Sequence, residues 1–288
     1  MTAPALALVL VAAVLHATWN LFAKRLGGGA GAVWLYSTIS MICYAPVAAA
    51  LVWFTHPTVS TAGLGFMLGS AVIHVGYFIA LQRGYRMGDL SVVYPLARGT
   101  GPLLAAAAAV SFFGERPTLL AMLGAALITG GIIALAGGRA IFAPGTRSAP
   151  AGVAYGLLTG LFIAVYTLWD KQAVTVIGNA PILQEWGSNL GRSLLLLPAA
   201  WGRRVEVSRH WTADRRLIVG IALLSPLAYI LVLTAMVFTP VSYVAPAREI
   251  SILIGTAMGA RWLAESQPRL RLAGATAMVA GLIALVLG

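Results

Sequence analysis

Residues 114–135 read GERPTLLAMLGAALITGGIIAL, and residues 264–285 read AESQPRLRLAGATAMVAGLIAL. At a constant offset of 150 residues, eight of these 22 positions are identical. The identical pairs include two pairs of glycines, Gly124 with Gly274 and Gly131 with Gly281. A fixed offset between matching stretches indicates an internal duplication. We therefore expect two related halves, each of which ends on one of these apolar segments.

A second match supports the duplication. Residues 93–98 read VYPLAR and residues 244–249 read VAPARE, and the two stretches align at an offset of 151 with a proline in the third position of each. The halves are not equivalent in chemistry, because Ala245 stands where the first half carries Tyr94.

The composition places the chain in a membrane. Hydrophobic residues make up 60% of the 288 positions and charged residues only 9%, whereas a soluble protein carries roughly 25% charged residues. Ten apolar segments each have about 20 residues, the length that an α-helix needs to cross the hydrocarbon core. The predicted segments are 4–23, 31–54, 62–84, 91–113, 117–137, 151–170, 181–201, 216–238, 242–264 and 270–287.

Five of these segments fall in each half of the chain. We therefore predict an all-α integral membrane protein in which residues 1–137 form the first five-helix repeat and residues 151–288 the second. Residues 138–150, rich in Gly, Ala and Pro, form the linker, and residues 202–215 are expected to be a charged connection. Because five is odd, the second repeat enters the membrane from the opposite side. Inverted repeats of this kind are found in secondary transporters, where they enclose a central cavity.

Basic residues lie mainly between the apolar segments. The chain has 19 Lys and Arg against 8 Asp and Glu, a formal charge of +11. In a soluble protein this charge would suggest a nucleic-acid partner, but here we expect contacts with membrane lipid head groups and no nucleic acid.

The basic residues are divided unequally between the two alternating sets of loops. One set carries only Arg116 and Lys171. The positive-inside rule therefore predicts that the other set faces the cytoplasm of a plasma (inner) membrane and that both termini lie outside. That other set carries 14 basic residues, namely Lys24, Arg25, Arg83, Arg86, Arg139, Arg147, Arg203, Arg204, Arg209, Arg215, Arg216, Arg261, Arg269 and Arg271.

The seventh segment carries Glu185, Asn189 and Arg192 on one helical face, at positions i, i+4 and i+7. Ionisable groups inside a membrane are costly and indicate function. Glu185 and Arg192 are two turns apart, so we expect each to find partners across a cavity. The alternative is a buried polar stripe that only holds helices together.

The fourth segment carries Tyr94 and Arg98 one turn apart, with Pro95 between them. Pro95 removes a backbone donor and disturbs the helix, which is a structural role. The guanidinium of Arg98 can bind a carboxylate or phosphate of a solute. It can equally form a salt bridge with Glu185 or Glu249 that locks one conformation.

Several further residues are expected to be structural. The ninth segment contains Pro246, Arg248 and Glu249, and since adjacent residues on a helix point about 100° apart, we expect at least one of the two charged residues to pair with a neighbouring helix. Glu115 and Glu265 each precede a helix that begins near a proline. A carboxylate in that position satisfies free backbone N–H groups and opposes the positive end of the helix dipole.

Histidines and aromatic residues complete the candidate set. His16 shares a face of the first segment with Trp19, and His74 lies near Tyr77 in the third. Histidine titrates near neutral pH, so these residues could relay protons or simply pack; no thiol or carboxylate is spaced with them as a metal site would require. The candidate substrate-binding residues are His16, Trp19, Asn20, His74, Tyr77, Tyr94, Arg98, Tyr166, Glu185, Asn189, Arg192 and Tyr229.

Three stretches carry a resemblance to a known family. GDLSVVYPLARGTGPLL at 88–104, the FFGE turn at 112–115 and AVLHATWNLFAKR at 13–25 are similar to the drug/metabolite transporter superfamily, EamA type. The resemblance implies a basket of ten helices around a central cavity, export of metabolites or drugs, and no cofactor. It also suggests cytoplasmic termini, in conflict with the distribution of basic residues.

We therefore predict a secondary transporter, and specifically an exporter, that moves small organic metabolites such as amino acids or amphipathic drugs by alternating access at a central polar and aromatic site. Proton binding at Glu185 or Glu249 would couple to transport, because an apolar helix favours a neutral carboxyl group. The alternative is a flippase component for a lipid or lipid-linked head group, or a membrane accessory subunit without solute flux. Enzyme activity is not expected, since the sequence offers no nucleophile with an ordered base and no metal-spaced cluster.

Overall fold

The computed structural model describes residues 1–26, 29–88, 90–135, 150–260 and 268–288, and within these ranges the chain is helical with no strand. The helices are α1 (Ala3–Leu26), α2 (Ala30–Thr55), α3 (Thr61–Met87), α4 (Leu90–Phe113), α5 (Leu119–Leu135), α6 (Pro150–Thr175), α7 (Pro181–Gly202), α8 (Arg204–Phe238), α9 (Val241–Ala247), α10 (Ile250–Ala260) and α11 (Pro268–Leu287). Apart from Pro150, which begins α6, the predicted linker lies outside the described residues, as does Glu265.

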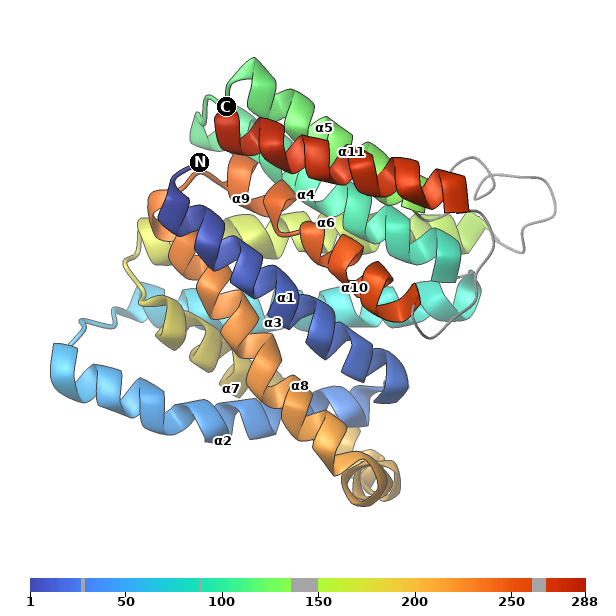
Figure 1. Ribbon diagram of the computed structural model, residues 1–288. Helices are drawn as coiled ribbons and strands as arrows, with labels where there is room; N and C mark the ends of the chain where they lie inside the picture. Colours follow the sequence, from blue (N-terminus) through green and yellow to red (C-terminus); the bar gives the residue numbers. More distant parts are fainter. Residues whose placement is uncertain (27–28, 89, 136–149, 261–267) are drawn as a thin grey trace.

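Each of the ten predicted apolar segments corresponds to helix, with two differences. The ninth segment is broken into α9 and α10 at Arg248 and Glu249, just after Pro246, whereas α4 continues past the equivalent Pro95. The charged connection 202–215 was expected between helices, but it is helical from Arg204, and α8 bends at Asp214 with non-helical φ −121 and ψ 17. Figure 1 shows the first turns of α8 nearly end-on, at an angle to the rest of the helix.

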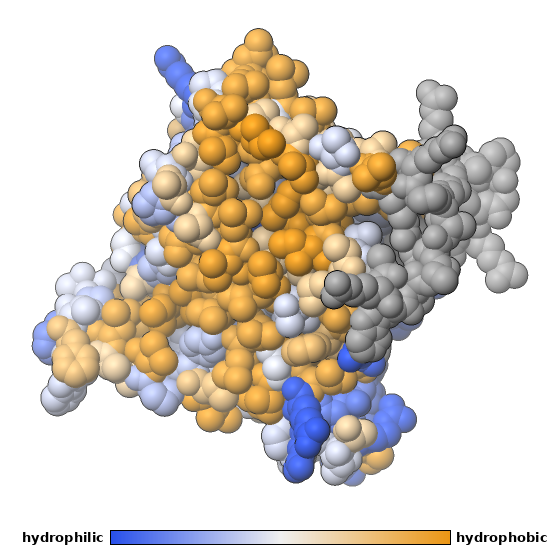
Figure 2. All heavy atoms as spheres, viewed as in Figure 1, coloured by the Kyte–Doolittle hydropathy of each residue, from blue (hydrophilic) through white to orange (hydrophobic). Residues whose placement is uncertain are grey.

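The outside of the bundle is apolar, as a lipid-facing surface must be. Six helices are long and apolar enough to cross a membrane, namely α1, α2, α3, α4, α6 and α8, and α5 and α11 are shorter apolar helices. Their outward side chains include Val14, Leu68 and Leu123, each about half exposed. Figure 2 shows apolar side chains across the middle of the surface, with hydrophilic ones gathered where α8 begins.

The helices pack as two intertwined bundles. One bundle consists of α3, α4, α6 and α7, and the other of α8, α9, α10, α1 and α2. Each bundle takes helices from both halves of the sequence, and exchanging the halves turns one bundle into the other. Two further contacts join equivalent helices, α2 with α7 and α5 with α11, near opposite edges of the molecule (Figure 1).

The contact between α5 and α11 displays the inverted repeat directly. A Cβ atom built on Gly124 would lie 2.6 Å from the carbonyl oxygen of Gly281, and one built on Gly131 would lie 2.6 Å from that of Gly274. Gly124 is equivalent to Gly274, and Gly131 to Gly281. Exchanging the two halves therefore converts the first contact into the second. The pairing also runs antiparallel, as an inverted repeat requires. Small residues allow this close approach of two backbones in a membrane.

Both chain termini lie on the same face. The amino group of Met1 donates a hydrogen bond to the carbonyl oxygen of Val286 at 3.1 Å, and Figure 1 shows the two ends close together. An even number of membrane crossings produces this arrangement, which agrees with ten segments.

Replacing Gly124 with Ala should destabilise the protein. The added methyl group meets backbone atoms of α11 that cannot move aside, and overpacking of this kind costs about 1–3 kcal/mol. Gly130→Ala is the matched control, because nothing lies within 4 Å of its Cβ position. Thermal unfolding of both variants in detergent should show a lower midpoint for Gly124→Ala alone, and equal midpoints would contradict the packing described for α5 and α11.

Candidate functional site

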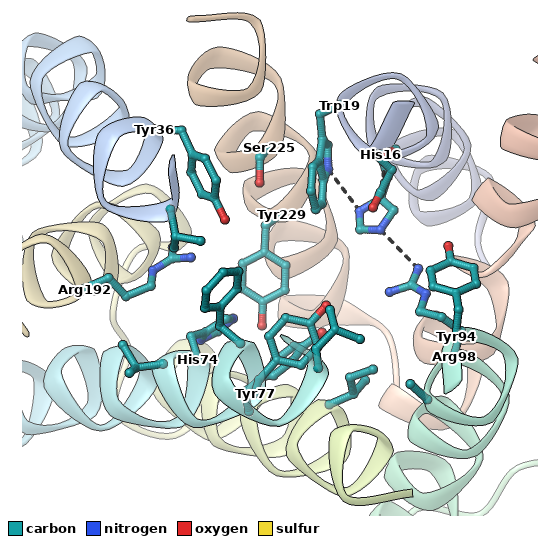
Figure 3. A pocket seen from close by; sticks show the side chains of 18 of the residues that line it. His16, Trp19, Tyr36, His74, Tyr77, Tyr94, Arg98, Arg192, Ser225 and Tyr229 are labelled. Atoms are coloured by element: carbon teal, nitrogen blue, oxygen red, sulfur yellow. Dashed lines mark hydrogen bonds between the residues drawn. The ribbon is translucent and has the colours of Figure 1, made fainter. Parts of the chain in front are cut away.

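A cavity of about 150 Å³ lies between the two bundles. Eleven of the twelve residues predicted to bind substrate line it, and the exception is Asn189, which is buried beside it. Figure 3 shows the side chains converging from several helices. The lining residues are His16, Trp19, Asn20, Val33, Tyr36, His74, Val75, Tyr77, Phe78, Leu81, Tyr85, Tyr94, Ala97, Arg98, Ile163, Tyr166, Glu185, Arg192, Leu196, Ser225 and Tyr229.

The cavity extends from the middle of the bundle toward the face where α1 ends and α2 begins. Tyr36 and Tyr94 lie within two turns of the helix ends at that face, and Tyr85 lies in the last turn of α3. On the opposite side, toward the chain termini, the lining stops near Tyr166 and Glu185. The cavity is therefore displaced toward one face of the membrane.

One end of the cavity is formed by Arg98 of α4. Its Nη2 atom lies 2.9 Å from Oε2 of Glu249, and both side chains are buried. Arg98 and Glu249 occupy equivalent positions in the two halves at the offset of 151, so the salt bridge joins the two bundles at matching points. The sequence left two roles open for Arg98, binding an anionic group of a solute or forming a salt bridge with Glu185 or Glu249. The structure shows the salt bridge with Glu249.

Arg248 lies beside this pair. Its Nε atom lies 3.2 Å from Oε1 of Glu249, and its Nη2 atom is 3.4 Å from Oγ1 of Thr167 on α6. The guanidinium also lies over the ring of Tyr166 at 5.8 Å from its centre. Because the helix breaks at Arg248 and Glu249, both adjacent side chains point into the protein, and Glu249 takes part in ion pairs with Arg98 and Arg248.

His16 of α1 lies between two donors. Arg98 donates to its Nε2 atom at 3.1 Å, and Nε1 of Trp19 lies 3.3 Å from its Nδ1 atom (Figure 3). A guanidinium has no acceptor, so His16 accepts the bond from Arg98 as a neutral ring. A neutral imidazole has one acceptor nitrogen, so the ring serves one of these donors at a time.

The other end of the cavity is formed by α7. Nη2 of Arg192 lies 2.8 Å from Oε1 of Glu185, which also accepts a hydrogen bond from Nδ2 of Asn189 at 2.7 Å. The expectation that Glu185 and Arg192 would find separate partners across the cavity is therefore wrong. The long side chain of Arg192 runs back along the helix and spans the two turns. Oε2 of Glu185 is buried without a hydrogen-bond partner.

Aromatic rings lie between these two charged ends. His74 stacks on Tyr166 with ring centres 4.3 Å apart, and Tyr77 and Tyr229 each approach Tyr166 edge-on. The Nδ1 atom of His74 lies 2.8 Å from the backbone oxygen of Ser70. Because a carbonyl only accepts, Nδ1 carries the proton and Nε2 remains an acceptor at the cavity wall.

Asp170 of α6 is a buried carboxylate that is not among the residues predicted from the sequence. It accepts hydrogen bonds from the hydroxyl of Tyr229 at 2.6 Å and from Nε2 of Gln184 at 3.0 Å. The sixth segment was predicted to end at Asp170, which placed this residue at the membrane surface, but α6 continues to Thr175. The spacing from Tyr166 to Asp170, one helical turn on the same face, was the signal that could have identified it.

Glu115 caps a different helix from the one expected. Its two carboxylate oxygens accept hydrogen bonds from the backbone N–H groups of Val241 at 2.8 Å and Ser242 at 2.9 Å, at the start of α9. The expectation that Glu115 would satisfy free N–H groups was right, but these groups belong to the second half of the chain. The carboxylate thus ties the turn before α5 to α9.

Within the described residues, no three His, Cys, Asp or Glu side chains are placed to hold a metal ion. The chemistry that the cavity offers is recognition: guanidinium groups at both ends, the carboxylate of Glu185 at one of them, aromatic faces between them, and a single acceptor on His74. These groups suit a small polar or charged solute.

Comparisons with known proteins agree with this architecture. A family model described as "EamA-like transporter family" matches residues 3–137 and again residues 150–287. No curated protein matches the sequence. A solved structure described only as "Crystal structure of protein" shares the fold, with a TM-score of 0.76, 15% sequence identity, and coverage of 100% of this chain and 98% of that chain.

Proposed function

The chain belongs to the EamA-like transporter family, and from this premise we propose that it exports small organic metabolites, such as amino acids, by alternating access at the central cavity. Members of this family are transporters of small solutes and not enzymes. The observation that carries the proposal is the cavity between two bundles that exchange under the internal symmetry.

The symmetry supplies a mechanism. Two bundles with the same construction and opposite orientation can exchange conformations, so that an opening on one face becomes an opening on the other. On the side of the termini, the bundles are held together by Tyr229 with Asp170 and by Lys171, whose Nζ atom donates to backbone oxygens at the end of α8. Transport would require these contacts to break and equivalent ones to form on the other side.

The lining supports a small solute that carries charge. A volume of about 150 Å³ is smaller than the roughly 300–1,000 Å³ of sites for drug-sized ligands, which favours small metabolites over bulky amphipathic drugs. An anionic group fits Arg98 or Arg192, and an ammonium group fits the carboxylate of Glu185. The rings of Tyr166 and Tyr229 provide an apolar or cation-binding surface between them.

Purified protein in liposomes should move labelled solutes from a panel of amino acids, quaternary amines and sugars. His74→Phe should reduce that flux about tenfold, because it keeps the ring stack on Tyr166 but removes one acceptor worth about 1–1.5 kcal/mol. Leu272→Ala, on the exposed face of α11, is the control and should transport normally.

Two results would count against this proposal. No flux above empty liposomes across the panel, with stabilisation by lipid head groups instead, would favour the flippase or accessory-subunit alternative. Normal flux in His74→Phe would remove that residue from the binding site.

Coupling to protons gives a second test. Glu185 lines the cavity, and its buried Oε2 atom has no hydrogen-bond partner, so this oxygen is open to protonation. Glu185→Gln cannot bind that proton, and we expect the pH dependence of flux to flatten. Glu249→Gln is the companion variant, since Glu249 lies away from the cavity lining. Unchanged pH profiles in both variants would exclude coupling through these two carboxyl groups.

We propose that the cavity faces the cytoplasm in this conformation. Lys24, Arg86 and Arg204 lie at the face toward which the cavity extends, and positively charged loops stay in the cytoplasm. Both termini then lie outside the plasma (inner) membrane. A C-terminal alkaline phosphatase fusion should be active and a C-terminal fluorescent protein dark; the opposite pair of results would show cytoplasmic termini.

A further inference from the structure

Asp170 differs from the other two carboxylates buried near the cavity. Glu185 is paired with Arg192, and Glu249 with Arg98 and Arg248. Asp170 is 0% exposed, and in the part of the chain that the structure describes it forms no salt bridge. Its direct partners are neutral donors, namely the hydroxyl groups of Tyr229 and Ser70 and the side-chain amide of Gln184. A buried carboxylate without a paired cation is costly when ionised, so burial favours binding of a proton.

Tyr229 connects Asp170 to the cavity. The residue lines the cavity, and its hydroxyl lies 2.6 Å from Oδ2 of Asp170, whereas Asp170 itself does not reach the lining. A phenol hydroxyl can donate and accept at the same time. Tyr229 can therefore accept a proton on one side while it donates on the other.

The opposite side of Asp170 offers no such route. Gln184 donates to Oδ1 of Asp170 and accepts from Nδ2 of Asn179 at 2.8 Å, and Asn179 in turn donates to the backbone oxygen of Gly63. This chain runs toward the turn between α6 and α7, on the face of the termini. Side-chain amides do not titrate in the physiological range. The chain therefore orients Asp170 without carrying protons to that face.

We propose that Asp170 is a proton-binding residue that exchanges protons with the central cavity through the hydroxyl of Tyr229. A hydronium ion in the cavity gives a proton to the oxygen of Tyr229 as the tyrosine passes its own proton to Oδ2 of Asp170. The products are water, a neutral tyrosine and a neutral carboxyl group. No other reactant is needed.

The protonation state of Asp170 also affects the contact between the bundles. Asp170 lies on α6 of one bundle and Tyr229 on α8 of the other. A hydrogen bond to an ionised carboxylate is roughly twice as strong as one between neutral groups. Proton binding therefore weakens a contact that closes the side of the termini. This role in gating rests on the proposed transport function; the proton site itself does not.

Other charged and titratable groups surround the site and set its environment. Arg192 and Glu185 of α7 act on Asp170 through space, and Arg248 acts on Tyr229. The ring of His74 on α3 lies against that of Tyr229, with centres 5.8 Å apart. Lys171 is adjacent in sequence, but its Nζ atom is bonded to backbone oxygens of Met236 and Thr239. A test must therefore separate Asp170 from Glu185.

Infrared difference spectra of the full-length protein in lipid nanodiscs provide that test without any solute. Lowering the pH should produce the carbonyl band of a protonated carboxyl group. Asp170→Asn should remove one component of that band, and Glu185→Gln should retain the same component. A spectrum of Asp170→Asn that superimposes on the wild-type spectrum would overturn the proposal.

The relay is tested by the rate at which this component forms after a rapid drop in pH. Tyr229→Phe should slow it at least about tenfold, since a positioned proton donor contributes on the order of 10²–10⁴ in rate. Tyr77→Phe is the matched control, because Tyr77 lines the same cavity and contacts Tyr166 but is not bonded to Asp170. An unchanged rate in Tyr229→Phe would overturn the relay. If Asp170→Asn fails to fold, the rate measured for Tyr229→Phe still tests the relay. Both infrared measurements need no solute, so an absence of flux in the liposome panel would not affect them.

Discussion

A charge inside a lipid bilayer must find its counter-charge within the protein, because the hydrocarbon offers none. In the membrane-embedded core that the structure describes, three arginines, Arg98, Arg192 and Arg248, pair with two carboxylates, Glu185 and Glu249. Removing one member of a buried ion pair costs about 3–5 kcal/mol, since the remaining charge is left without a partner. The positions of the helices around the cavity therefore depend on these pairings.

The internal symmetry explains where one of these salt bridges forms. Arg98 and Glu249 stand at equivalent positions in the two halves, yet one is basic and the other acidic. The two side chains therefore form a salt bridge with each other, whereas two identical charged residues would repel. The glycine contacts between α5 and α11 remain symmetric in both structure and sequence. The duplication has thus kept its packing residues alike and changed its charged residues, which produces a cavity with chemically different ends.

Much of this architecture is readable from the sequence because it follows from short-range rules. The apolar segments, the duplication and the residues of the cavity are predicted from helix length, a fixed offset and residues that share a helical face. The errors have a common origin in contacts between segments. The sequence does not show that Arg192 reaches back to Glu185, that Glu115 caps a helix of the other half, or that Asp170 lies inside the bundle, because each depends on how far apart the helices lie and where they end.

The central claim is that the two bundles move against each other around the cavity, and distances between spin labels test it most directly. In a Cys43→Ser background, which removes the single native cysteine, one pair of labels at Val176 and Phe238 reports on the side of the termini, and a second pair at Lys24 and Arg86 on the opposite side. All four residues are exposed, and each pair spans the two bundles. We expect two populations for each pair, with the first distance lengthening as the second shortens when pH or solute changes. A single unchanging distance for both pairs would contradict it.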